Sequence, residues 1–187
     1  MRIVAGRFRG AALATPKGQD IRPTSDRVRE SVFNILAHGV GVDLEDARVL
    51  DLFAGTGALG LEAMSRGAAF ALFVEESAQA RGLIRRNAEM LGVMGSTRIY
   101  RRDAAKLGEI GTLAPFGLAF ADPPYGRQLG EAALASAAAG GWLLPDAVAV
   151  IEESGQAEFS VPEDFALIDQ RIYGGTAIYF LRFAASS

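Results

Sequence analysis

Short aliphatic runs alternate with helix-period segments from residue 47 onward, and this rhythm limits the fold more than any other feature of the chain. Five runs have the length of β-strands, at residues 49–52, 71–74, 97–100, 118–121 and 148–151. Helical periodicity marks segments near 58–66, 77–91 and 128–139, with a shorter one near 104–109. Strands that alternate with helices form crossover units, so the sequence predicts a parallel sheet with helices on both faces.

The C-terminal part departs from this rhythm. Two strand-like runs, 165–173 and 176–183, are joined by Gly174-Gly175, which is a two-residue hairpin signal. An antiparallel hairpin is therefore expected to close the sheet. The predicted fold class is α/β, with about seven mostly parallel strands in one main domain.

The N-terminal part is basic, although the whole chain has a net charge of −3. Its first 30 residues hold seven basic side chains against three acidic ones, whereas the remainder holds 12 against 19. Residues 2–13 alternate around Gly6 and Gly10, which predicts a short hairpin outside the main domain. We therefore expect a basic hairpin or extension at 1–24 and the main domain at 25–187, with Thr24 or Ser25 capping its first helix. The charge pattern fits local phosphate binding, or equally a solvated Arg-rich surface.

Composition excludes several classes of site. The chain has no cysteine and one histidine, His38. A disulfide framework, an iron–sulfur cluster, a cysteine nucleophile and a His-rich metal centre are ruled out, and we expect no metal. No apolar run reaches the roughly 18 residues of a membrane span, and the charged N-terminus is unlike a signal peptide. The expected protein is soluble, cytoplasmic and monomeric.

A glycine-rich loop follows the first predicted strand. Gly55, Gly57 and Gly60 have the spacing G-x-G-x-x-G, which lets a backbone approach a nucleoside cofactor. The pattern alone fits a dinucleotide, S-adenosylmethionine or a tight turn without a ligand. Asp51, four residues before Gly55, would repel a diphosphate but suits the cationic groups of S-adenosylmethionine. The loop with Asp51 therefore favours that cofactor.

Two more acidic residues follow the next two strands. Glu75 comes 20 residues after Gly55, where a carboxylate can accept both ribose hydroxyls. The alternative is an exposed acid that starts a helix, as we expect for Glu76. Asp103 could accept a hydrogen bond from the adenine amino group, although alone it would be an ordinary helix N-cap.

The tetrapeptide Asp122-Pro123-Pro124-Tyr125 decides the class of chemistry. It follows the strand at 118–121, and ligands bind at the carboxyl edge of such sheets. The Asp122 carboxylate and the Pro123 carbonyl can each accept one N–H of a nucleobase amine, while Tyr125 stacks on the base. The alternative, a diproline turn with a surface tyrosine, is weakened by the position of the motif behind the fourth strand.

Three other candidates are assigned ordinary roles. His38, near the end of the first helix, is expected at the surface, where it faces the helix dipole. Trp142 is expected to pack in the core or at an edge. Glu152-Glu153 is expected to be the solvated end of the fifth strand rather than part of a metal site.

Five stretches give the chain a resemblance to a known family. They are Met1–Arg9 (MRIVAGRFR), Arg22–Leu36 (RPTSDRVRESVFNIL), Val49–Ala63 (VLDLFAGTGALGLEA), Asp122–Gly126 (DPPYG) and Tyr173-Gly174 with Thr176. With them the chain resembles the class I, Rossmann-like S-adenosylmethionine-dependent methyltransferases. Within that class it resembles the RsmD family, the bacterial guanine-N2 methyltransferases of small-subunit (16S) ribosomal RNA. Residues 10–13, Gly-Ala-Ala-Leu, depart from the more basic sequence usual there.

The resemblance implies a role for each part of the predicted site. Cofactor-binding residues would be Asp51, Phe53, Gly55, Thr56, Gly57, Glu75, Asp103 and Ala104. The target amine would be held by Asp122, Pro123, Pro124 and Tyr125. The segment from Arg22 to Arg29 would cover the cofactor or lead the substrate to it. The substrate-binding candidates are Arg7, Arg9, Arg22, Arg27 and Arg29.

The expected reaction is methyl transfer from S-adenosylmethionine to the N2 amine of a guanine in 16S ribosomal RNA, free or within a small-subunit particle. An amine buried in a duplex is out of reach, so the base must be unstacked or exposed in a loop. One alternative is a DNA adenine-N6 or cytosine-N4 methyltransferase, but residues 122–187 show no target-recognition insertion. The other is a non-catalytic RNA-binding module that retains a cofactor pocket.

Overall fold

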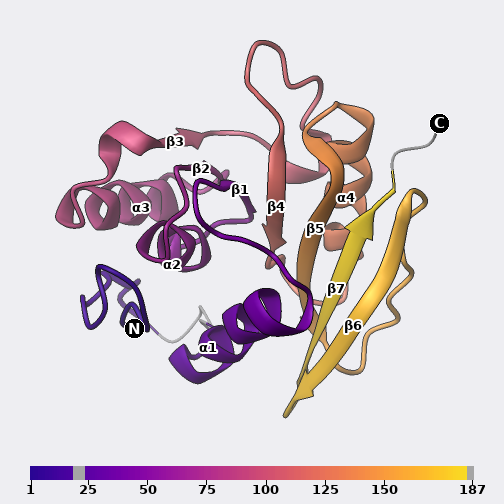
Figure 1. Ribbon diagram of the computed structural model, residues 1–187, viewed down its shortest axis with the longest axis horizontal. Coiled ribbons are helices and arrows are strands. Elements are labelled where there is room, and N and C mark those ends of the chain that lie inside the picture. Colours follow the sequence, from indigo (N-terminus) through magenta and orange to yellow (C-terminus); the bar gives the residue numbers. More distant parts are fainter. Residues whose placement is uncertain (19–23, 185–187) are drawn as a thin grey trace.

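The computed structural model describes residues 1–18 and 24–184, and within these ranges seven strands form one sheet (Figure 1). The strands are β1 (Arg48–Leu52), β2 (Phe70–Val74), β3 (Thr97–Tyr100), β4 (Phe116–Ala121), β5 (Leu143–Ser154), β6 (Phe165–Tyr173) and β7 (Thr176–Phe183). Their order across the sheet is β3-β2-β1-β4-β5-β7-β6. The first five strands pair in parallel, and β7 pairs antiparallel with both β5 and β6. The predicted α/β fold class, with its C-terminal antiparallel hairpin, is confirmed.

Four α-helices connect or flank these strands in the described ranges, namely α1 (Asp26–Asn34), α2 (Ala58–Ser65), α3 (Ala78–Met90) and α4 (Leu129–Ala139). A π-helical turn, Ile35–Gly39, extends α1, and 3₁₀ turns cover Met94–Ser96 and Ala104–Lys106. The helix expected at 104–109 is thus a single 3₁₀ turn, followed by Gly108 with φ of +71°. β5 begins five residues earlier than expected, because Leu143 pairs with Phe116 ahead of an irregularity that separates this pair from Leu118–Val148.

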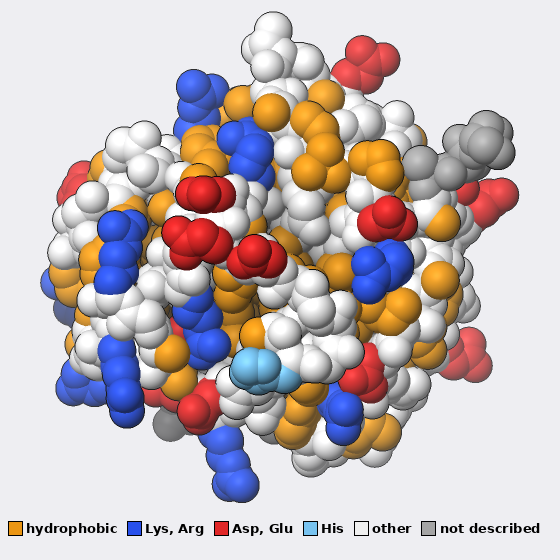
Figure 2. Space-filling view, viewed as in Figure 1, with side chains coloured by type: hydrophobic (Ala, Val, Ile, Leu, Met, Phe, Trp, Pro, Cys, Tyr) orange, Lys and Arg blue, Asp and Glu red, His pale blue; other side chains and the backbone are white. Residues whose placement is uncertain are grey.

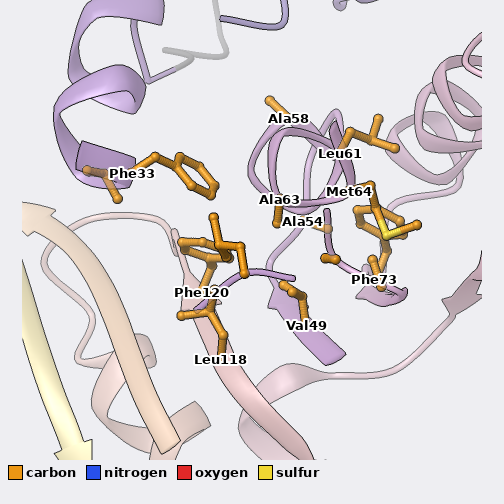
Figure 3. Packing of buried hydrophobic residues seen from close by; sticks show 14 of the residues in the cluster. Phe33, Val49, Ala54, Ala58, Leu61, Ala63, Met64, Phe73, Leu118 and Phe120 are labelled. Atoms are coloured by element: carbon orange, nitrogen blue, oxygen red, sulfur yellow. The ribbon is translucent and has the colours of Figure 1, made fainter. Parts of the chain in front are cut away.

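Each face of the sheet has its own apolar core, because alternate strand residues point to opposite sides. Val49, Phe73 and Phe120 pack in the cluster that includes residues of α1, α2 and α3. On the other face, Leu50 and Leu72 pack in the cluster that includes α4 and the turn after β3. Figure 3 shows Phe33 of α1 pointing toward Phe120 of β4, and their ring centroids are 5.5 Å apart. Coverage of both faces explains the near-continuous apolar runs in the sequence.

The strand order reverses between β1 and β4, and this is the position at which ligands bind in open α/β sheets. The chain runs outward through β1, β2 and β3, and then crosses back to β4 on the other side of β1. Leu52 and Ala121 are paired neighbours, so the residues that follow β1 and β4 leave the sheet side by side. The site described below lies at this edge.

The N-terminal hairpin packs against α2 and does not stand outside the domain as expected (Figure 1). Ile3 and Leu13 are buried in the same cluster as residues of α2. The backbone N–H groups of Val4 and Ala5 donate to the Glu62 carboxylate, at 2.8 and 3.1 Å. The close approach explains Gly6, where a Cβ would lie 2.0 Å from a backbone oxygen of α2.

Candidate active site

The glycine loop and the acids around it form what we call the β1 corner, made of Asp51, residues 53–57 and Glu75. Asp51 is 1% exposed, and its Oδ2 accepts a hydrogen bond from the Gly60 N–H at 3.0 Å. This bond ties the end of β1 to the first turn of α2. Burial, with a further contribution from the negative charge of Glu75, raises the pKa of Asp51 to about 8. A cation bound nearby would favour the ionised form.

The three glycines of the loop serve different purposes. A Cβ on Gly60 would lie 2.5 Å from the Phe73 ring, so Gly60 is required by packing between α2 and β2. A Cβ on Gly57 would lie 3.2 Å from the same ring. At Gly55, with φ of +58°, no atom lies within 4 Å of an added Cβ, so its bare backbone faces open space. Gly55 is therefore the glycine of this loop that a nucleoside can approach, and the loop fits the cofactor expected from the sequence.

Glu75 stabilises the loop from the end of β2. Its Oε1 accepts from the Gly55 N–H at 2.9 Å, and its Oε2 accepts from the Ser77 N–H at 3.0 Å. Each oxygen keeps lone-pair capacity for a hydroxyl donor. Phe53, at the start of the loop, has φ of +54°, which is rare for an aromatic residue and marks local backbone strain.

The remaining predicted cofactor residues lie near this corner. Asp103 follows β3, is half-buried, and accepts from the Ala105 N–H at 2.9 Å, so it is the N-cap that the alternative interpretation described. Ala104 is buried beside it. Thr56 is buried in the loop, and its carbonyl accepts from the Asn87 side chain at 3.0 Å. Glu75 and Asp103 follow the ends of adjacent strands, since Val74 of β2 pairs with Tyr100 of β3.

The second half of the site is the β4 corner, made of Asp122-Pro123-Pro124-Tyr125 and the side chains bonded to it. Asp122 directly follows β4, and its N–H lies 3.5 Å from the Leu52 carbonyl at the end of β1. Pro123 is buried and Pro124 is exposed. Among the described residues, no backbone N–H donates to the Pro123 carbonyl. Asp122 and Pro123 thus offer two hydrogen-bond acceptors beside the β1 corner.

A chain of hydrogen bonds joins Tyr125 to three distant segments. Its hydroxyl donates to Glu152 Oε1 at 2.5 Å and lies 3.2 Å from the Thr176 hydroxyl. The other oxygen of Glu152 accepts from the Thr24 hydroxyl at 2.5 Å. The same Thr24 oxygen lies 3.4 Å from Asp122 Oδ2. The segment before α1, β5 and β7 therefore all meet at the β4 corner.

Two groups of the β4 corner, Asp122 and Tyr125, have raised pKa values. Burial, and then the negative charge of Glu152, raises the pKa of Asp122 well above its usual range. Burial, and then the hydrogen bond to Glu152, also raises the pKa of the Tyr125 hydroxyl. A buried group with a raised pKa at the carboxyl edge of a sheet, such as Asp122, is characteristic of functional sites.

Two expectations from the sequence need correction or extension here. Glu152 and Glu153 are 9% and 1% exposed, so the prediction that they form a solvated strand end was wrong. β7 pairs with β5 as far as Ser154, past the point at which β4 ends, so the end of β5 is covered rather than solvated. Ser25 is the helix cap, accepting from the Val28 N–H at 3.2 Å, which leaves Thr24 free to join the site.

The predicted substrate-binding arginines have different positions. Arg7, Arg9 and Arg27 are exposed, and Arg22 lies outside the described residues. Arg29 is 0% exposed; it pairs with Glu62 at 3.3 Å and with Asp26 at 2.8 Å, and it bonds to the carbonyl of Arg2. Its burial contradicts a role at the RNA surface and gives it a structural role between α1, α2 and the hairpin.

Basic side chains are unevenly distributed over the surface. Figure 2 shows Lys and Arg side chains gathered at the left and lower left, over the region of the hairpin and α3, while acidic and basic side chains are mixed elsewhere on this face.

Trp142 is buried in the core as expected, and its Nε1–H donates to the Gly108 carbonyl at 2.8 Å. His38 is exposed, as expected. No helix in the described ranges has both the length and the apolar character needed to cross a membrane.

A cavity of about 490 Å³ opens beside the β4 corner. Its walls come from the start of α1, the end of β5 and the β6–β7 turn, and its lining residues include Thr24, Arg27, Glu152, Tyr173 and Thr176. Two of these, Glu152 and Thr176, are bonded to Tyr125. The geometry thus provides a loop open to a nucleoside at one corner and a cavity lined by acceptors at the next.

Comparison with known proteins now identifies the family. A family model described as conserved hypothetical protein 95, which represents the RsmD family, matches residues 1–182. The chain belongs to the RsmD family. Ribosomal RNA small subunit methyltransferase D of Escherichia coli is 37% identical over 180 residues, which cover 95% of this chain and 87% of that protein. The match of the RsmD family model includes the hairpin and both corners of the site.

Solved structures show the same fold. The Escherichia coli protein yhhF superimposes with a TM-score of 0.84 at 32% identity, covering 100% of this chain and 99% of that one. An RNA methyltransferase from Salinibacter ruber, solved with S-adenosyl-L-homocysteine, superimposes with a TM-score of 0.67 at 16% identity, covering 89% of this chain and 96% of that one. The second likeness shows the fold alone, which is the Rossmann-like methyltransferase fold expected for the RsmD family.

Proposed function

We propose that this chain transfers a methyl group from S-adenosylmethionine to the exocyclic N2 amine of a guanine in small-subunit (16S) ribosomal RNA. The observation that carries the proposal is the position of Asp122 and Pro123, which leave β4 beside the open backbone of Gly55 after β1. Membership of the RsmD family and the name of the Escherichia coli relative support the RNA substrate. Such a substrate would place the enzyme in the cytoplasm.

The β1 corner would hold the cofactor, which supplies an activated methyl group on a sulfonium and leaves as a neutral thioether. Asp51 and the loop at Gly55 and Gly57 would face its methionine part, and Glu75 its ribose. Phe53 and Thr56 belong to the same loop, and Asp103 with Ala104 would border the adenine. The unfilled space over Gly55 and the lone pairs left on Glu75 support this assignment.

The β4 corner would hold the amine. Asp122 accepts one N–H and the Pro123 carbonyl accepts the other, which orients the nitrogen lone pair away from the ring and toward the methyl donor. Pro124 keeps this corner extended. Two contacts at its hydroxyl fix Tyr125, whose ring can then stack on the base. After attack the amine is cationic and strongly acidic, so its surplus proton can pass to the Asp122 carboxylate that accepts its N–H, without a base of special strength.

The basic residues would contact the RNA backbone. Arg7 and Arg9 on the hairpin and Arg27 beside the cavity are exposed and can each pair with a phosphate. Arg22 remains a candidate for the same role. A monomer would suffice, since both corners of the site come from one chain.

One experiment tests the proposal directly. The protein is incubated with labelled S-adenosylmethionine and with RNA or small-subunit particles from cells that lack the enzyme, and the modified nucleoside is mapped. We expect N2-methylguanine at one position of 16S ribosomal RNA. Labelling of DNA on adenine or cytosine would refute the RNA assignment. Cofactor binding in a calorimeter without any transfer to RNA or DNA would favour a non-catalytic RNA-binding module.

A further inference from the structure

Glu152 is a buried carboxylate at the end of β5 that also lines the cavity beside Tyr125. Its two oxygens are fixed by hydroxyl donors, Tyr125 on one side and Thr24 on the other, both at 2.5 Å. A carboxylate has about four lone-pair positions, so each oxygen can accept one more donor. Glu152 is therefore an oriented acceptor with unused capacity at the wall of the cavity.

Among the residues that the structure describes, no Lys or Arg side chain forms an ion pair with this carboxylate. The ion pairs among the described residues are Arg29 with Asp26 and Glu62, Arg66 with Glu62, and Arg171 with Asp169, so neither Glu152 nor Asp122 belongs to one. Thr24 connects the two carboxyl groups through its hydroxyl, which lies within 3.4 Å of both. Two neighbouring acids without a cation are costly to bury unless N–H or O–H donors reach them. A ligand rich in adjacent donors would satisfy them.

Guanine has such an edge. It presents N1–H next to its 2-amino group, so that N1–H and one N2–H point the same way while the second N2–H points toward N3. Adenine and cytosine instead place an unprotonated ring nitrogen beside their amine, and a carboxylate repels that lone pair. Uracil has a ring N–H but no amine. The donors of guanine match the Glu152 carboxylate, the Asp122 carboxylate and the Pro123 carbonyl.

We propose that Glu152 accepts the N1–H of the target guanine while Asp122 and Pro123 hold its N2 amine, so that Glu152 selects guanine among the bases that carry an amine. The inference rests on the proposed function, because it requires a guanine-N2 substrate at the β4 corner. Sites built to bond a substrate N–H reject analogues that lack it by large factors, because a buried acceptor is then left unpaired. Glu152 would thus be the specificity-determining residue of this site.

The test uses 2-aminopurine, which keeps the 2-amino group of guanine but replaces N1–H with an unprotonated ring nitrogen. The modified position is mapped first, and small-subunit RNA is then assembled with guanine or 2-aminopurine there. The wild-type enzyme is expected to prefer guanine by roughly a hundredfold or more in kcat/KM. In Glu152→Gln the side-chain amide can donate to the ring nitrogen, so the ratio of kcat/KM for guanine to that for 2-aminopurine should fall at least tenfold.

Glu153→Gln is the matched control. Glu153 is also buried at the end of β5 and accepts from the Gly126 N–H at 2.9 Å, but it is not among the residues that line the cavity. This variant should leave the ratio unchanged. If Glu152 served only to hold Tyr125, Glu152→Gln would slow both substrates alike or abolish both while cofactor affinity persisted, and the inference would be overturned.

The wild-type enzyme alone also tests the inference, whether or not the variants fold. Equal rates on guanine and on 2-aminopurine would show that N1–H is not recognised, and would overturn it while the proposed function stood. Failure of the wild-type enzyme to methylate guanine in any small-subunit RNA or particle would instead remove the proposed function, and the inference with it.

Discussion

The β1 corner and the β4 corner each centre on a buried or half-buried aspartate after a parallel strand, but they are assembled differently. Asp51 is held by Gly60, nine residues away, and the loop is held by Glu75, so the main contacts of the β1 corner lie within residues 51–77. Asp122 and Tyr125 meet Thr24, Glu152 and Thr176, which come from three other segments. The β1 corner therefore comes mainly from one β-α-β unit, whereas the β4 corner depends on segments from across the chain.

The largest expected effect separates the two corners by function. Replacing Asp122 with alanine removes an acceptor of the amine and should lower kcat by about a thousandfold, while cofactor affinity measured by calorimetry stays nearly constant. Asp51→Ala should do the opposite, weakening cofactor binding first. An Asp122→Ala enzyme that works at the wild-type rate would refute the role of the β4 corner.

The same difference explains what the sequence could predict. The glycine loop, Asp51 and Glu75 are close in sequence, and their spacing after two apolar strands was enough to place them together. Asp122 and Tyr125 could be found because their motif is continuous. Thr24 and Glu152 could not, because their role depends on β5 lying beside β4 and on α1 beginning near both. Arg29 was misassigned for a related reason, since charge patterning does not reveal that a buried Glu62 lies opposite.

The second prediction concerns Arg29, whose substitution should alter the β4 corner without removing any residue of it. Arg29 pairs with Glu62 inside the protein, and its Nη1 lies 3.5 Å from the Thr24 carbonyl. Arg29→Met leaves Glu62 with one fewer partner and should lower the free energy of unfolding by about 3–5 kcal/mol in urea titrations. Arg27→Met, at an exposed position two residues earlier, should change it by less than about 0.5 kcal/mol.

At temperatures where Arg29→Met remains folded, its kcat and its cofactor affinity can be compared, and the two values report on the β4 corner and the β1 corner separately. Because Thr24 would be less well positioned, kcat should fall more than cofactor affinity does. Equal stability of Arg29→Met and Arg27→Met would mean that the buried pair contributes little. Equal loss of kcat and of cofactor affinity would mean that the two corners are not independent.

The third prediction concerns pH and the β1 corner. The folded pKa of Asp51 is raised to about 8, so between roughly pH 4 and pH 8 the folded protein holds a proton that the unfolded chain has lost. The free energy of unfolding should therefore decrease as pH rises through this window, by at most about 1.4 kcal/mol per pH unit from this group. Asp51→Asn should remove that part of the slope in urea titrations at pH 5, 6, 7 and 8.

The pH dependence of cofactor affinity should also depend on Asp51, but its sign should be opposite to that of the free energy of unfolding. A cationic ligand favours the ionised carboxylate, so binding expels the proton and affinity should rise with pH up to about 8. Asp51→Asn should flatten this rise, and Asp122→Asn serves as the control at the other corner. If wild type and Asp51→Asn gave parallel pH profiles in both measurements, Asp51 would already be ionised in the free protein.

The smallest expected effect is on the salt dependence of RNA affinity. It tests whether the RNA contacts the hairpin that packs on α2 as well as the β4 corner. Each phosphate contact contributes about 0.9 to the slope of log affinity against log salt on a duplex and about 0.7 on a single strand. Replacing Arg7 and Arg9 with glutamine should therefore lower that slope by about 1.4–1.8. The loss of affinity between 50 and 200 mM salt should then be smaller than that of the wild type by a factor of roughly ten. Arg27→Gln, beside the cavity, should lower it by about half as much. Filter binding to small-subunit RNA at several salt concentrations measures both. If only Arg27→Gln changed the slope, the RNA would contact the protein at the substrate corner alone, and the basic hairpin would act through its packing on α2.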